Sequence, residues 1–115
     1  MNREDKNRQT RAKILASATA EFAAHGYEAA SLNTVCLSGG ISKGIIYHYF
    51  ESKDELYLAC LKECFHSLTE YLKDHLTAEP EPEDPLAAYF SARLDFFQTH
   101  EDYVRILNCY PSRGQ

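Results

Sequence analysis

Three serines, Ser31, Ser42 and Ser52, stand ten or eleven residues apart, and the pair Gly39-Gly40 lies between the first two. Serine is favoured where a helix begins, because its side-chain oxygen accepts a hydrogen bond from a free backbone N–H of the first turn. Glycine is favoured where a helix ends. Residues 31–50 therefore predict two helices of about two turns each, and helices this short are not stable alone. Longer neighbours must hold them.

The flanking segments predict those neighbours. Before the short helices, Ile14, Leu15, Ala18 and Phe22 recur at helical spacing and predict a helix over about residues 8–25, which Gly26 ends. After them, Ser52 and Glu55 form a capping box that opens a long fourth helix. The apolar stripe expected on this helix is Tyr57, Leu61, Cys64, Phe65, Leu68, Leu72 and Leu76.

The C-terminal third predicts two more helices after a stiff connection. Residues 79–85, EPEPEDP, hold three prolines and four acids and cannot continue a helix. Asp84 and Pro85 are typical of an N-cap and a first helical position, and Leu86, Phe90, Leu94 and Phe97 are expected on one face of this fifth helix. A sixth begins near Glu101 and stops before Pro111. No strand-like alternation occurs, so the predicted class is all-α.

The overall composition suits one small domain. The 115 residues carry a net charge of −5, but residues 1–50 hold six Lys/Arg against four Asp/Glu, so the acid lies in the C-terminal half. Exposed charges more than about 8 Å apart are largely screened from one another at physiological salt. The negative net charge of the whole chain therefore does not exclude a polyanionic partner. The N-terminus lacks the apolar segment of a secretory signal, and no apolar run approaches a membrane span. We expect a cytoplasmic protein with reduced cysteines.

The short helix that follows Ser31, the turn at Gly39-Gly40 and the short helix that follows Ser42 make a helix-turn-helix arrangement. In such an arrangement the second helix lies in the DNA major groove. In this interpretation Lys43 offers a positive charge to a phosphate or a guanine edge. Tyr47 and His48 offer donors at phosphate height, and Gly44 lets two backbones approach closely. Ile41, Ile46 and Phe50 are expected to point into the core.

The stretch from Arg11 to about Leu61 resembles the N-terminal domain of the tetracycline-repressor (TetR) family of bacterial regulators. The matching positions include Gly40 to Gly44, Tyr47 to Phe50 and Ser52 to Leu56. Val35-Cys36 and Gly39-Gly40 depart from the usual Ile-Ala and Ala-Gly, as small residues replacing small ones. The resemblance implies a three-helix DNA-binding domain, a long connecting helix and a partial helical domain for ligand binding and dimerisation.

The resemblance also implies boundaries, contacts and partners. Residues 8–68 would be the DNA-binding domain, with the helix-turn-helix unit at 31–50, and residues 69–115 the incomplete start of a regulatory domain after the linker 79–85. The implied partners are double-stranded DNA with a palindromic operator, a small-molecule effector and a second copy of the chain, with no membrane and no cofactor. The implied DNA contacts are Ser31, Thr34, Ser42, Lys43, Gly44, Ile45, Tyr47, His48 and Lys53.

Other interpretations stay open at this point. Ile45 fits a thymine methyl or a buried position, and Tyr47 and His48 could be ordinary surface residues. Cys60 and Cys64 lie one helical turn apart, so they are core residues or, with His66 or Cys109, ligands of a soft metal. No Walker spacing, nucleophile–base set or metal triad supports an enzyme. A helical protein-interaction module or a fragment without DNA binding is the alternative function.

The short C-terminus raises a further expectation. Family members typically continue through more helices, so we expect a truncated chain. In it, half of the apolar stripe on the fourth helix would lack the helices that usually cover it. The same would hold for Phe90, Phe96, Phe97 and Ile106. Such a chain would bind DNA as a single weak head, because two linked heads multiply affinity.

Overall fold

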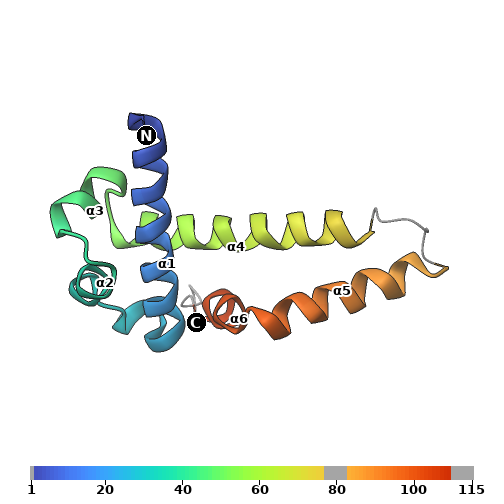
Figure 1. Cartoon of the computed structure of the whole chain (residues 1–115). Helices are drawn as coiled ribbons and strands as arrows, with labels where there is room; N and C mark the ends of the chain where they lie inside the picture. Colours follow the sequence, from blue (N-terminus) through green and yellow to red (C-terminus); the bar gives the residue numbers. More distant parts are fainter. Residues whose placement is uncertain (1, 77–82, 110–115) are drawn as a thin grey trace.

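The computed structural model describes residues 2–76 and 83–109, and within them the chain is helical with no strand (Figure 1). The helices are α1 (Arg3–Ala29), α2 (Leu32–Gly39), α3 (Lys43–Tyr49), α4 (Lys53–Leu76), α5 (Pro85–Thr99) and α6 (Glu101–Asn108). The all-α prediction is confirmed. Most of the predicted linker 79–85 lies outside the described residues.

Helix α1 is longer than its apolar pattern predicts. It begins at Arg3 instead of about residue 8, because the side chain of Asn2 accepts a hydrogen bond from the Asp5 N–H at 2.8 Å and caps the first turn. Gly26, at φ 82°, interrupts the helical path as predicted, and a last turn follows to Ala29. The extension adds two basic and two acidic residues, Arg3, Glu4, Asp5 and Lys6, to the end of α1 that lies beside α3 (Figure 1).

The caps predicted for the short helices are present. Ser31 Oγ accepts from the Thr34 N–H at 3.3 Å, and Ser42 Oγ accepts from the Ile45 N–H at 3.2 Å. Gly40 ends α2 with φ 63°, a left-handed conformation that favours glycine.

Helix α1 holds α2 through two polar contacts. The buried Glu21 carboxylate accepts from the Ser31 N–H at 2.9 Å, next to the positive end of the α2 dipole. Ser17 donates to the Val35 carbonyl oxygen at 2.9 Å. The predicted neighbours therefore do support the short helices.

The core lies where α1 crosses α2, α3, the first half of α4 and α6. Ile41, Ile46 and Phe50 are buried in it, as predicted. The ring of Phe22 meets the ring of Tyr57 edge to face at 5.0 Å between centroids. The core side chains are Ile14, Leu15, Ala18, Phe22, Ala30, Val35, Ile41, Ile46, Phe50, Leu56, Tyr57, Ala59, Cys60 and Ile106.

Helix α4 starts at the predicted cap and turns most of the predicted stripe inward. Ser52 Oγ accepts from the Glu55 N–H at 3.1 Å, while Glu55 reaches back to the Glu51 N–H and not to that of Ser52. The prediction for Phe65 is wrong, because its side chain is more than half exposed. The other stripe residues are buried or half-buried.

Helix α5 returns along α4 and forms an antiparallel arm with it (Figure 1). Leu86, Phe90 and Leu94 of the predicted face are exposed, and Phe97 is half-buried. The buried residues of α5 are Ala92 and Phe96. Apolar residues occupy more than one side of α5, so spacing alone could not say which side meets α4. The arm explains a radius of gyration of 16.6 Å, against about 13 Å for a compact domain of this size.

Helix α6 folds back onto α1 and closes the core. Ile106 has no exposed surface, and the buried Tyr57 hydroxyl donates to the Ile106 carbonyl oxygen at 2.5 Å. Phe96 is also buried, with 1% of its surface exposed. The expectation that Phe96 and Ile106 would lack cover is therefore wrong, whereas Phe90 is exposed. None of the described helices is long and apolar enough to span a membrane.

Candidate nucleic-acid interface

Helices α2 and α3 lie on one side of α1, and α5 and α6 lie on the other (Figure 1). Within α3 only Ile46 is buried, and Tyr49 is half-buried. The predicted contacts that are exposed on or next to α3 are Ser42, Lys43, Gly44, Ile45, Tyr47 and His48. The short helix therefore presents most of its circumference to solvent.

Ile45 and Tyr47 are unusual for an exposed surface. Ile45 is 43% exposed and Tyr47 is 47% exposed, so the alternative of a buried Ile45 is excluded. Exposed apolar and aromatic side chains suit a partner that offers thymine methyl groups and phosphate oxygens. His48 is exposed and its ring packs edge to face on Tyr49 at 5.0 Å.

The start of α2 also presents hydroxyl groups, those of Ser31 and Thr34. Thr34 is exposed and Ser31 is half-buried. Ser31 and Ser42 use their oxygens as cap acceptors, and each hydroxyl keeps its hydrogen to donate to a phosphate. A serine at the N-cap can therefore both begin a helix and contact DNA.

Lys53 differs from the rest of the predicted set. Its Nζ donates to the Glu28 carbonyl oxygen at 3.1 Å and lies 4.9 Å from the centre of the Tyr27 ring. These contacts join the start of α4 to the end of α1. A phosphate would have to compete with the Glu28 carbonyl for this ammonium group, so its predicted role carries a cost that Lys43 does not share.

Gly44 has no neighbour that explains it within the described residues. A Cβ atom built there would meet nothing within 4 Å. The close backbone approach predicted from the sequence is therefore not made among residues 2–76 and 83–109. If it occurs, the other side belongs to a partner.

Two basic residues near α3 were missed by the sequence prediction. Arg3 and Lys6 are exposed on the extended first turns of α1. This end is tied to α3, because the Tyr49 hydroxyl donates to Asn7 Oδ1 at 3.0 Å. Residues 31–50 contain no Asp or Glu, but Glu4 and Asp5 lie on the same first turns of α1, so the extension offers two cations to a phosphate without changing the net charge of this side. An N-cap at Asn2 followed by Glu4 and Asp5 was the available signal.

The cysteines form no metal site in the part of the chain that the structure describes. No group of three or more His, Cys, Asp or Glu side chains there could hold an ion. Cys60 and Cys64 are buried, and burial raises the pKa of each thiol from 9.0 to about 11. A protonated, buried thiol is a poor ligand and a poor nucleophile, so the core interpretation is confirmed.

Sequence comparison finds similar proteins among bacterial transcriptional regulators. Residues 14–60 match the model of the family described as bacterial regulatory proteins, tetR family. The chain is 29% identical over 99 residues to the HTH-type transcriptional activator FasR of Mycolicibacterium smegmatis, covering 86% of this chain and 45% of that protein. It is 37% identical over 86 residues to the HTH-type transcriptional repressor AcnR of Corynebacterium diphtheriae, covering 67% and 45%.

Solved structures match a similar part of the chain. A TetR-like transcriptional regulator from Rhodococcus superposes with a TM-score of 0.74 at 26% identity, covering 88% of this chain and 54% of the other. A proposed transcriptional regulator from Streptomyces coelicolor gives 0.72 at 31% identity, covering 85% and 51%. The chain thus spans about half the length of the relatives it matches.

Proposed function

Because residues 14–60 of this chain belong to the tetR family of bacterial regulatory proteins, we propose that the protein regulates transcription by placing α3 in the major groove of DNA. The relatives are transcriptional regulators and not enzymes, as the sequence predicted. We propose a repressor, as AcnR is named, acting in the bacterial cytoplasm.

The exposed surface of α3 is the observation that carries this proposal. A seven-residue helix that buries one side chain contributes little to the core. Its exposed Lys43, Ile45, Tyr47 and His48 supply a charge, a methyl-bearing side chain and hydrogen-bond groups. Major-groove recognition needs these groups on a helix that the rest of the fold holds rigidly.

We further propose that two copies read a palindromic operator and that a small molecule modulates them. Helix-turn-helix proteins of this kind bind two half-sites through a two-fold arrangement. Residues 8–68 would be the DNA-binding domain, and residues 69–115 would belong to the regulatory part. Ile106 of the second part packs in the core of the first, so a change near α6 would be felt by α1.

The test selects duplexes from a randomised library with the 115-residue chain and then measures affinity by fluorescence anisotropy. Lys43→Ala and Ile45→Ala should change the preferred sequence, because good base contacts discriminate by about 1–3 kcal/mol. Tyr47→Phe and Lys53→Ala should weaken all duplexes about equally, since phosphate contacts position without specifying sequence. Lys62→Ala, an exposed charge on α4, is the matched control.

Two results would contradict the proposal. If Tyr47→Phe altered sequence preference while Lys43→Ala and Ile45→Ala did not, the orientation assigned to α3 would be wrong. If no duplex were retained even at low salt, the chain would be a helical interaction module, because DNA binding of this type weakens as salt rises and is strongest at low salt.

A further inference from the structure

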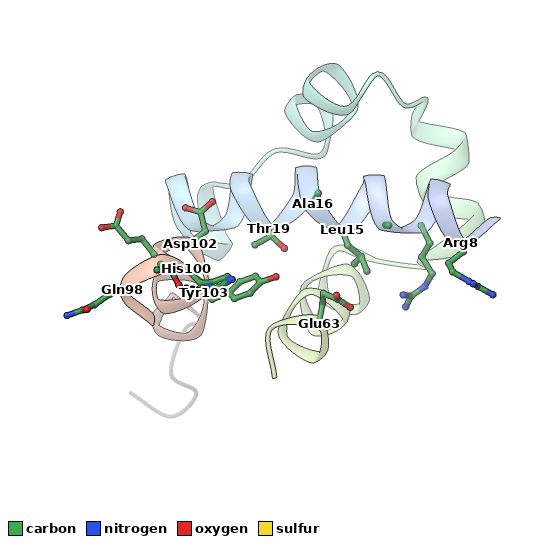
Figure 2. Close-up of a pocket in the computed structure, with 13 residues that line it drawn as sticks. Arg8, Leu15, Ala16, Thr19, Glu63, Gln98, His100, Asp102 and Tyr103 are labelled. Carbon is green, nitrogen blue, oxygen red and sulfur yellow. Dashed lines mark hydrogen bonds between the residues drawn. The ribbon is translucent and has the colours of Figure 1, made fainter. Parts of the chain in front are cut away.

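A groove of about 850 Å³ runs along α1 on the side opposite α2 and α3, where α4 and the α5–α6 junction approach it (Figure 2). Ala12, Leu15 and Ala16 form its floor. They share one face of α1 with Arg8 and Arg11 at one end and Thr19 at the other. The groove is therefore long, with an apolar middle and polar ends.

The end near Arg8 and Arg11 offers only donors. Neither guanidinium lies within 4 Å of a carboxylate in the described residues, and that of Arg11 lies 5.3 Å from the centre of the Phe50 ring. Arginine stays charged at any ordinary pH, and its planar donors match a carboxylate or a phosphate. This end suits an anionic group.

The opposite end offers mainly acceptors. His100 Nδ1 lies 2.8 Å from the Phe96 carbonyl oxygen. Because a carbonyl only accepts, Nδ1 carries the hydrogen of this contact. Glu101 and Asp102 add two negative charges, and the Tyr103 ring lies 5.4 Å from that of His100. The two full charges outweigh the positive end of the α6 dipole, about half a charge. This end suits an ammonium group, which aromatic faces also attract.

The distance between the ends follows from the helix. Residues 8 and 19 of α1 are eleven positions apart, which corresponds to about 16 Å along the axis. Glu63 lies across the groove from Leu15 in Figure 2. Its negative charge disfavours a second anionic group in the middle of a ligand, so an anion is favoured only at the arginine end.

We propose that this groove binds an elongated zwitterion with an aliphatic body. Its carboxylate lies against Arg8 and Arg11, its methylene chain covers Ala12, Leu15 and Ala16, and its ammonium group faces Asp102 and Tyr103. Such a ligand would join α1 to α6. A role in controlling DNA binding rests on the function proposed above, but the binding itself does not.

The test titrates the ¹⁵N-labelled chain with 12-aminododecanoic acid, an ω-amino acid, and follows amide chemical shifts without DNA. Amides of Leu15, Ala16 and Tyr103 should move together and saturate. Dodecanoic acid and dodecylamine each lack one charged end and should bind about tenfold more weakly, since each loses one charge-assisted contact. The shorter 6-aminohexanoic acid cannot span both ends and should bind weakest.

Two substitutions and their controls locate the ends. Arg8→Gln should weaken the ω-amino acid about tenfold and leave dodecylamine unchanged, while Lys13→Gln, an exposed charge on the same helix, should change neither. Asp102→Asn should weaken the ω-amino acid and leave dodecanoic acid unchanged, with Asp95→Asn as control. Equal binding of all four compounds, no binding, or shifts away from the groove would overturn the proposal. Because no DNA is present, these outcomes are independent of the anisotropy test.

Discussion

Gly39 sits at the turn between the two helices of the proposed DNA-reading unit, and Gly39→Ala tests the packing there. Helix propensity alone favours alanine by up to about 1 kcal/mol, since Gly39 is the last residue of α2 and its φ is not positive. On that ground the substitution would stabilise the protein. The surroundings of Gly39 oppose this.

A Cβ atom at residue 39 would lie 2.7 Å from Ile41 Cδ1, 3.2 Å from Ile41 Cγ1 and 3.3 Å from Ser17 Cβ. Cδ1 is the end of a side chain and can rotate, but Ile41 is buried in the core and Ser17 is fixed by its bond to Val35. Forcing extra carbon into packed surroundings costs about 1–3 kcal/mol. The cost exceeds the gain in propensity, so we expect a net destabilisation of about 1 kcal/mol.

The assay is urea denaturation followed by far-ultraviolet circular dichroism in a double-mutant cycle with Ile41→Val. Valine lacks Cδ1, the atom at 2.7 Å, so Gly39→Ala should be neutral or stabilising in the Ile41→Val background. The coupling between the two sites should be about 1 kcal/mol or more. If Gly39→Ala stabilised the wild-type chain and the two changes were additive, the Ile41 contact would not limit this turn.

Two further predictions concern the rest of the core. Ile106→Ala should lower the free energy of unfolding by about 2–5 kcal/mol, because Ile106 is buried. Leu94 is exposed, so Leu94→Ala should change that free energy by less than about 0.5 kcal/mol. Equal effects of the two substitutions in urea denaturation would mean that α6 does not dock on α1. The raised pKa of Cys60 keeps its thiol protonated in the folded chain between pH 9.0 and about 11, where the unfolded thiol ionises. Its contribution to stability is therefore complete below pH 9.0 and is lost as pH rises toward 11, and Cys60→Ala should reduce the loss measured by urea denaturation.

The local signals of the sequence predicted the reading unit well, because each cap depends on residues within one helical turn. Ser31, Ser42 and Gly40 act where they were expected to act. The face of α5 could not be predicted in this way. Leu86, Phe90 and Leu94 follow helical spacing as closely as the buried Ala92 and Phe96 do, and only the position of α4 decides between the two sides.

The sequence also could not predict which groups pair in polar contacts between distant parts of the chain. Lys53 has the charge of a phosphate contact, but its bond to the Glu28 carbonyl depends on where α1 ends relative to α4. The burial of Ile106 depends on α6 returning to α1 across the 71 residues that separate Ala29 from Glu101. Spacing within a helix carries no information on contacts between distant helices, so the bond of Lys53 and the burial of Ile106 could be seen only in the folded structure.

Helix α1 is the element that joins the two halves of the candidate machinery. On one side Asn7, Ser17 and Glu21 hold α2 and α3 through side-chain hydrogen bonds. On the other side its face from Arg8 to Thr19 forms the groove, and α6 packs beside it. A packed helix moves as a rigid body over a few turns, so a ligand that shifts α6 against α1 changes the support of α3 without touching it. Control of DNA binding from the groove therefore requires no contact between α6 and α3.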